Sequence, residues 1–318
     1  MSTAVKAKID VPLAYDQRAD AGAVAVLRRL LRVIGDNIEG SISGEDPEHL
    51  HQLRIAVRRT RTVQRQLARV FPPEELPGYR AEFRWLQQAT GDARDLDVYL
   101  EDLDSLREML PGTVRGDLDP LMPILAHRRL SARAEMTRAL RSVRSANLFE
   151  DWDRLLESLV ELPLDDRPAA EQSIGVVAGR RIRKVYKRIV RMGETIDADT
   201  PPQAYHDLRK KGKELRYLLE LFGVKLFDEE AVTPLVRSLK GLQDVLGRHQ
   251  DREVQIAMLR SSVDELAGLP GGGAACMAVG TLVERLRADE QAARDEFGAQ
   301  FADLGSTGQR ALVRETFR

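Results

Sequence analysis

The sequence contains very little of several features that mark particular classes of protein. A single cysteine, Cys276, is present in 318 residues, which excludes an internal disulfide and a thiolate metal cluster and fits a reducing compartment. The longest nearly uncharged stretch, 269–283, contains three consecutive glycines and is too short to span a bilayer. The N-terminal residues also lack the apolar core of a signal peptide. We therefore expect a soluble, cytoplasmic protein that has no contact with a membrane.

Aromatic residues and an excess of one charge are also missing. Aromatics make up 5% of the chain, and 49 Lys and Arg residues face 50 Asp and Glu residues, for a formal net charge of −1. The charge of the whole chain therefore favours no particular partner. With 43% hydrophobic and 31% charged residues, the chain is long and apolar enough to form a packed core, which excludes disorder. Any electrostatic function must come from the way in which charges are sorted along the chain.

The hydrophobic pattern predicts an all-α fold. Apolar residues recur three and four positions apart in segments rich in Arg, Leu, Ala and Glu, whereas the alternating pattern of strands is scarce. Asp46-Pro47 and Thr200-Pro201 each have the form of a helix N-cap followed by a proline in the first turn. Proline and glycine divide the chain into segments of helix length, with breaks near 44–47, 71–73, 111–112, 162–163, 200–202 and 271–273.

One motif occurs twice. His51-x-Leu53-Arg54 recurs 155 residues later as His206-x-Leu208-Arg209, and such self-similarity indicates an internal repeat. The register continues in further equivalent pairs: Arg58 and Lys213, Arg61 and Arg216, and, after a slip of one residue, Gly91 and Gly247, and Asp95 and Asp251. We therefore predict two copies of a four-helix unit joined near 161–170. The predicted units are an N-terminal segment (1–19), a first repeat (20–160), a second repeat (161–302) and a C-terminal tail (303–318).

Two segments are rich in cations and contain no acid. Residues 51–69 include six arginines and a histidine, and residues 178–191 include seven basic residues. At 100° per residue, the basic residues of the first segment form a stripe roughly 80° wide and about 21 Å long, opposite an apolar face. The stripe consists of His51, Arg54, Arg58, Arg61 and Arg65. The second copy repeats it with His206, Arg209, Lys213 and Arg216. In the helices that precede the two stripes, the corresponding basic residues are Arg28 and Arg32 in the first copy, and Arg180, Lys184, Lys187 and Arg191 in the second.

Rows of like charge need a partner, because like charges four residues apart destabilise a helix by a few tenths of a kcal/mol per pair. Residues 92–108 contain seven acids and offer an internal partner; a polyanion is the external alternative. The shortage of aromatics beside the rows argues against single-stranded nucleic acid, and no Gly-x-x-x-x-Gly-Lys-Ser/Thr loop is present for a nucleotide. Guanidinium and ammonium groups suit bare phosphate oxygens, and a row of this length suits a linear chain of phosphates.

The histidines and acids near the rows suggest a role in binding more than in catalysis. His51 and His206 each begin a stripe, and a bound phosphate would raise their pKa above the usual value near 6.5, so affinity should increase below about pH 6.5. Neither is followed four residues later by a histidine or carboxylate, and we expect no metal or other cofactor. The acids Asp95, Asp97, Asp251 and Glu253 are interpreted as first-turn and ion-pairing residues. No catalytic residue is assigned.

The paired His-x-Leu-Arg-x-x-x-Arg/Lys-x-x-Arg helices, with the Leu-Gln and Gly-x-x-Arg/Gln-Asp segments that follow them, resemble the CHAD family, named for conserved histidines in an α-helical domain. The resemblance covers residues from about 20 to 300. It implies two antiparallel four-helix bundles related by a pseudo-two-fold axis, whose basic faces meet at a central groove that binds inorganic polyphosphate. Carried over by motif position, the binding residues are His51, Arg54, Arg58 and Arg61 in the first half and His206, Arg209, Lys213 and Arg216 in the second, with Arg28, Arg32, Arg180 and Lys184 added from the preceding helices.

The two halves are not equivalent. Gln250 stands where the first copy has Arg94, and Glu220 stands where it has Arg65, so we expect the second half to bind more weakly or in another register. The N-terminus also lacks the Glu-x-Glu-x-Lys strand of the CYTH-type domain that often precedes members of the family.

The expected function is non-catalytic binding of inorganic polyphosphate, which targets this protein, or a protein bound to it, to polyphosphate-rich granules. Three alternatives remain. They are a nucleic-acid-binding protein, a metal-dependent enzyme for polyphosphate or phosphate esters that uses the Asp95 and Asp251 segments, and a scaffold whose basic faces meet an acidic protein. The polyphosphate hypothesis requires the basic rows of both copies to converge on one shared cleft.

Overall fold

The computed structural model describes residues 3–8, 10–197 and 199–318. Within these residues the chain forms helices and no sheet, and one isolated bridge pairs Arg18 with Ser173. The all-α prediction is therefore confirmed. No helix of the described residues is both long enough and apolar enough to cross a membrane.

The helices of the first half of the chain are α1 (Ala19–Ser43), α2 (Pro47–Gln66), the short η1 (Ala68–Val70), α3 (Leu76–Ala89), α4 (Gly91–Glu108), η2 (Gly112–Leu118), α5 (Leu121–Leu140) and α6 (Val143–Ser158). Those of the second half are α7 (Ile174–Gly193), α8 (Pro202–Leu218), the π-helical turn η3 (Leu219–Gly223), α9 (Val224–Leu226), α10 (Glu229–Ser261), α11 (Val263–Ala267), α12 (Gly272–Leu304) and α13 (Thr307–Thr316).

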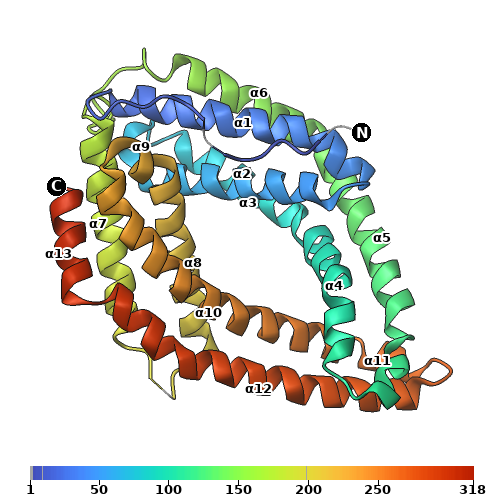
Figure 1. Ribbon diagram of the computed structural model, residues 1–318. Coiled ribbons are helices and arrows are strands. Elements are labelled where there is room, and N and C mark those ends of the chain that lie inside the picture. Colours follow the sequence, from blue (N-terminus) through green and yellow to red (C-terminus); the bar gives the residue numbers. More distant parts are fainter. Residues whose placement is uncertain (1–2, 9, 198) are drawn as a thin grey trace.

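Figure 1 shows the helices arranged as a four-sided frame. One side contains α1, α2, α3 and α6, the next contains α4 and α5, the third contains α10 and α12, and the fourth contains α7 and α8, with α13 outside α7. At one corner α2 contacts α8. At the opposite corner α4 meets α10, where the Tyr99 hydroxyl donates a hydrogen bond to the carbonyl of Val254 (3.0 Å). Segments that are distant in sequence therefore close the frame.

The start of α2 follows from local chemistry, and the start of α8 differs from the prediction. Asp46 caps α2 by accepting a hydrogen bond from the backbone N–H of Glu48 (2.8 Å), as its position before a proline predicts. In the second copy, however, the N-cap is Pro201 and no side chain caps the helix. The Thr200 hydroxyl instead accepts from the N–H of Asp197 (2.8 Å), because it closes the preceding loop.

The predicted breaks separate helices, but several others were missed, among them two in the first half that carry no proline. Between α3 and α4, the Thr90 hydroxyl donates to the carbonyl of Leu86 (2.9 Å), a local bond that competes with the helical pattern. Between α5 and α6, Ser142 caps the new helix by accepting from the N–H of Ser145 (3.2 Å). The tail also forms a helix, α13, which the sequence analysis did not anticipate.

Two hydrophobic clusters hold the frame together, and each draws on both halves of the chain. The larger cluster includes Leu53 of α2, Leu208 of α8 and Phe222, all fully buried. The smaller lies where α4, α5 and η2 meet α10, α11 and α12. Full burial of one such side chain contributes about 1.5–3 kcal/mol. Because the apolar faces of α2 and α8 enter the same cluster, the orientation of their basic faces is fixed.

The connection between the halves is anchored by a buried arginine. The side chain of Arg167 is 2% exposed and donates hydrogen bonds to the backbone carbonyls of Leu159 (2.7 Å), Leu162 (2.5 Å) and Pro163 (2.9 Å). Its guanidinium also lies 3.8 Å from the Asp20 carboxylate. These partners offset the cost of burying the charge, so residues 161–170 are part of the packed structure.

Candidate anion-binding site

A pocket of about 480 Å³ lies between α2 and α8 and receives cations from both helices. We call it the α2/α8 pocket. Its basic lining residues are Arg58, Arg61 and Arg65 of α2, Lys210, Lys211 and Lys213 of α8, and Arg188 of α7. The structure therefore brings members of both predicted stripes into one pocket, although they lie about 150 residues apart in the sequence.

Arg58 occupies the point where the two stripes meet. The pKa of Arg54 is lowered to about 10, mainly by burial and also by the charge of Arg58. Burial also lowers the pKa of Arg209, against the opposing effect of Asp251, and Arg58 again adds to the lowering. A lowered pKa of a basic group means that its surroundings disfavour the positive charge. The stripes thus form a crowded cluster of cations.

Lys213 shows this crowding most clearly. Its pKa is lowered to about 7, mainly by burial and also by the charges of Arg209 and Arg58, with Asp251 opposing them. In the part of the chain that the structure describes, Lys213 forms no ion pair. Its amino group is therefore about half neutral near pH 7. A bound anion would favour the ammonium form and would raise this pKa.

Two partly buried arginines of the stripes have unused donors. The Nε atoms of Arg58 and Arg209 are buried without a hydrogen-bond partner, whereas buried donors in folded proteins are nearly always paired. Arg54 is better satisfied, because it donates to the carbonyl of Gln87 (2.9 Å) and to the Thr90 hydroxyl (3.1 Å). The unused donors indicate a site with unmet capacity for an acceptor.

Carboxylates of the same chain neutralise only part of the basic lining. Glu214, which is 3% exposed, pairs with Arg65 (3.1 Å) and Lys211 (2.9 Å) and accepts a hydrogen bond from the Gln66 amide. Asp207 pairs with Lys210 (2.9 Å). These carboxylates belong to α8 and not to segment 92–108, which the sequence offered as the internal partner. Among the described residues, Arg58, Arg61, Arg188 and Lys213 form no ion pair with a carboxylate.

The departure at Glu220 has a direct structural effect. Its carboxylate pairs with Arg216 (3.2 Å) and also with Arg59 of α2. Arg216 and Arg59 both lie over the ring of Tyr217. Glu220 therefore neutralises Arg216, which is one of the cations of the second stripe that were predicted to bind the anion.

One acid of the segment 92–108, Asp97, is directed at α5. Asp97 is buried and pairs with Arg129 (2.7 Å) and Arg133 (3.2 Å). Asp251 of α10 pairs with Arg209 at 3.3 Å, the ion-pairing role expected of it. Burial raises the pKa of Asp95, with Arg54 opposing, and raises that of Asp251 in the same way, with Arg209 opposing.

The two motif histidines lie outside the lining of the α2/α8 pocket. Burial lowers the pKa of His51, and the charge of Arg94 lowers it further, so His51 gains its proton at a lower pH than we expected from the sequence. His206 contacts the side-chain oxygen of Gln250 through its Nδ1 atom. His51 therefore interacts with residue 94, and His206 interacts with the equivalent residue 250. This is one of the positions at which the two halves differ.

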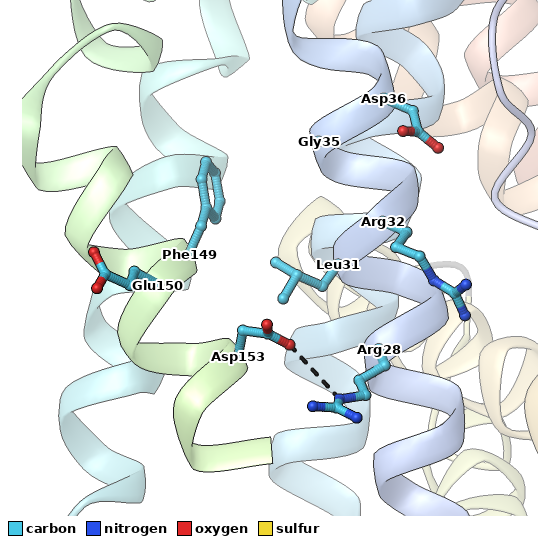
Figure 2. A pocket seen from close by; sticks show the side chains of 8 residues that line it. All are labelled: Arg28, Leu31, Arg32, Gly35, Asp36, Phe149, Glu150 and Asp153. Carbon is cyan, nitrogen blue, oxygen red and sulfur yellow. Dashed lines mark ion pairs between the residues drawn. The ribbon is translucent and has the colours of Figure 1, made fainter. Parts of the chain in front are cut away.

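Arg28 and Arg32 line a different pocket, of about 660 Å³, between α1 and α6. Figure 2 shows Arg28 directed at Asp153, from which it is separated by 3.6 Å, with Leu31 and Phe149 on facing helices. The predicted grouping of these arginines with the α2 stripe is wrong in geometry, because α6 covers this face of α1.

The prediction also chose the wrong face of α7. Lys187 and Arg191 line a groove of about 330 Å³ against α13, while Arg180 and Lys184 are exposed, and Arg180 donates to the side-chain oxygen of Gln172 (3.4 Å). The cation of α7 that reaches the α2/α8 pocket is Arg188. Arg188 lies within the basic segment 178–191 but outside the stripe predicted from it.

The described residues contain no group of three or more His, Cys, Asp or Glu side chains that could hold a metal ion. Guanidinium and amino groups make up most of the charged lining of the α2/α8 pocket, and they donate hydrogen bonds to anionic oxygens.

Comparisons with known proteins agree with this architecture. A profile of the CHAD domain matches residues 25–260. Two uncharacterized proteins from two strains of Mycobacterium tuberculosis are 31% identical over 214 residues, which cover 64% of this chain but only 38% of each relative. This chain thus matches about two fifths of the length of those relatives.

Two solved structures have the same fold. The crystal structure of the CHAD domain from the plant Ricinus communis has a TM-score of 0.74 and 24% identity, and the match covers 96% of this chain and 97% of that chain. PptA from Streptomyces chartreusis has a TM-score of 0.68 and 18% identity, with 89% and 99% covered. At these identities the likeness concerns the fold alone.

Proposed function

Since this chain belongs to the CHAD domain family, we propose that it binds inorganic polyphosphate in the α2/α8 pocket without changing it chemically. The observation that carries the proposal is the set of cations in one pocket that lack carboxylate partners: Arg58, Arg61, Arg188 and Lys213. Phosphate oxygens would accept hydrogen bonds from these groups, including the unused Nε donor of Arg58. Release of counterions from the polyanion would supply much of the binding free energy.

The lining of the pocket favours bare phosphate over nucleic acid. Its single aromatic residue, Tyr217, is 4% exposed and lies beneath the guanidinium groups of Arg59 and Arg216. Binding of single strands depends on exposed rings on which bases stack, and Tyr217 offers no such surface. RNA should therefore compete poorly with polyphosphate of equal charge.

A charge-reversal experiment tests the proposal. Arg58→Glu combined with Lys213→Glu should weaken binding of defined-length polyphosphate more than tenfold in a fluorescence anisotropy titration. The matched control is Arg28→Glu with Arg32→Glu, which changes charge equally in the α1/α6 pocket and should leave the affinity unchanged. Circular dichroism confirms that both variants are folded. Equal affinity of the two variants would refute the assignment of the site.

Salt dependence provides a second measure of the same site. If three or four phosphates are neutralised, log K should fall against log salt with a slope of about −2 to −3, by analogy with single-stranded nucleic acids. The Arg58→Glu and Lys213→Glu double variant should have a shallower slope. A slope near zero for the wild type would rule out binding through ion pairs.

We also propose that the two halves arose by duplication and are related by a pseudo-two-fold axis. Two pairs of equivalent positions support this. The charges of Asp95 and Arg54 interact, and the equivalent Asp251 and Arg209 form an ion pair; the charge of Arg94 acts on His51, and the equivalent Gln250 contacts His206. The difference between the halves is that α3 and α4 of the first half correspond to the single helix α10 of the second.

The proposed cellular role is targeting of this protein, or of a protein bound to it, to polyphosphate-rich granules. A fluorescent fusion should colocalise with a polyphosphate stain, and the Arg58→Glu and Lys213→Glu variant should be diffuse. Incubation with polyphosphate and Mg²⁺ or Mn²⁺ should release no inorganic phosphate. Release of phosphate would instead establish the metal-dependent enzyme considered above.

A further inference from the structure

Lys213 has an amino group that is about half neutral near pH 7, and it lines a pocket whose other charged groups are mostly cations. The charged groups that face it come from four helices: Arg58 and Arg61 of α2, Arg188 of α7, Arg209 and Arg216 of α8, and Asp251 of α10. The other carboxylates that line the pocket, Asp207 and Glu214, are paired with Lys210 and with Arg65 and Lys211.

We propose that Lys213 is a modification site that is acylated by small acyl phosphates bound in the α2/α8 pocket. The inference rests on the proposed function only in requiring that the pocket accept phosphate groups. The guanidinium groups of Arg58 and Arg61 would hold the phosphate, and the amino group of Lys213 lies in the same pocket. Because burial and the neighbouring cations lower the pKa of Lys213 to about 7 in the empty pocket, about half of its amino groups are neutral there at pH 7. An ordinary lysine, with a pKa near 10.4, has fewer than about one in a thousand. A bound acyl phosphate raises the pKa of Lys213 and removes part of the gain, whereas the holding of the phosphate beside the amino group adds to the rate.

The reaction needs no reagent besides the acyl phosphate. The lone pair of Lys213 Nζ attacks the carbonyl carbon, so that an N–C bond forms and the C–O bond to phosphate breaks. The proton that the nitrogen loses leaves on the departing group as hydrogen phosphate. The product is an uncharged amide, which removes one cation from the pocket and fills part of it. Acylated protein should therefore bind polyphosphate more weakly.

The test compares two lysines of the same chain. Wild-type protein is incubated with acetyl phosphate at pH 7.5, and acetylation is quantified by peptide mass spectrometry at Lys213 and at the exposed Lys225 of α9. The neutral fraction of Lys213 is about a thousandfold larger, and its weaker intrinsic nucleophilicity offsets part of this gain. By analogy with thiols, the offset is about 30-fold. Lys213 should therefore react at least tenfold faster than Lys225.

A second reagent separates the two contributions. The N-hydroxysuccinimide ester of acetic acid carries no phosphate, so its preference for Lys213 over Lys225 reports the neutral amino group alone, and the larger preference expected with acetyl phosphate reports the holding of the phosphate. Added inorganic phosphate should slow the ester at Lys213 as well, because a bound anion raises the pKa of this lysine. Inorganic phosphate should slow the reaction with acetyl phosphate at Lys213 and leave Lys225 unaffected. Equal or slower acetylation of Lys213 by acetyl phosphate would overturn the inference, and so would the absence of competition by phosphate.

The experiment uses no polyphosphate, so its result is independent of the proposed function. Selective acetylation of Lys213 in a protein that fails to bind polyphosphate would support the inference and refute the function. Binding of polyphosphate without selective acetylation would do the reverse. Lys213→Arg provides the control for peptide assignment, because it retains the charge and removes the nucleophile.

Discussion

Polyphosphate affinity should depend on pH through Lys213, in a range where ordinary lysines do not titrate. The pKa of Lys213 is lowered to about 7 in the free protein, and a bound phosphate chain stabilises the ammonium form and raises the pKa again. Below pH 7 the group is already protonated, so binding requires no proton. Above pH 7 binding must be accompanied by proton uptake, and the affinity falls as the pH rises.

The size of the effect follows from the pKa. If binding restores a pKa of 10 or more, the affinity falls about tenfold between pH 6 and pH 8, and about tenfold more by pH 9. A lysine with an ordinary pKa would leave the affinity unchanged over this range. Lys213→Arg, which stays charged, should remove most of the pH dependence and leave binding at pH 6 close to that of the wild type.

Isothermal titration calorimetry in buffers of different ionisation enthalpy measures the affinity and the number of protons taken up. We expect uptake of about half a proton at pH 7 and close to one at pH 8.5 in the wild type, and much less in Lys213→Arg. A wild-type affinity that is constant from pH 6 to pH 8.5 would refute the reasoning. An identical pH dependence in Lys213→Arg would assign it to another group.

Three further predictions concern stability. Glu214→Gln leaves Arg65 and Lys211 without their carboxylate partner and should lower the free energy of unfolding by about 2–3 kcal/mol; an unchanged urea midpoint would contradict this. Lys213→Met should raise the melting temperature most at pH 6, where the lysine is charged in the folded and the unfolded chain, and less at pH 9, where it is neutral in the folded protein but still protonated in the unfolded chain; equal effects at both pH values would be inconsistent with the lowered pKa. Gly193→Ala places a Cβ against the ring of Phe301 and should cost about 1–3 kcal/mol, whereas wild-type stability would show that the ring can move aside.

The helices could be predicted from the sequence where proline and glycine mark their ends. Gly44, Asp46 and Pro47 define the turn between α1 and α2, with Gly44 in the left-handed region at a φ of 70°. The breaks at Thr90 and Ser142 were missed because each depends on a single hydroxyl and its backbone partner. Such hydroxyls are common within helices too, so their residue type gives no clear signal.

The site could be predicted only in part, for a geometric reason. A basic stripe tells which residues share a face of a helix, but not which neighbour covers that face. On α2 and α8 the opposite apolar faces enter one core, which directs Arg58 and Lys213 into the same pocket. On α1 and α7 different helices cover different faces, so Arg28 and Lys187 lie in other pockets.

The lowered pKa of Lys213 could not be predicted from the sequence either. It depends on burial and on Arg58, a residue 155 positions away that only the fold brings near. The ordinary value near 10.4 is the natural expectation for a lysine in an exposed basic stripe. The predicted increase in affinity below pH 6.5 should also be smaller. Burial and the charge of Arg94 lower the pKa of His51, so it gains its proton at a lower pH.

The unpaired cations at the corner of α2 and α8 also make the molecule sensitive to its solvent. Their mutual repulsion is built into the folded state and relaxes when the chain unfolds, so small multivalent anions should act as stabilisers by screening and occupying the corner. Sulfate or phosphate buffer would then raise the melting temperature well above that in Tris and chloride at equal ionic strength. The buffer thus acts as a weak ligand, and the stability of this fold has a definite value only when the dissolved anion is specified.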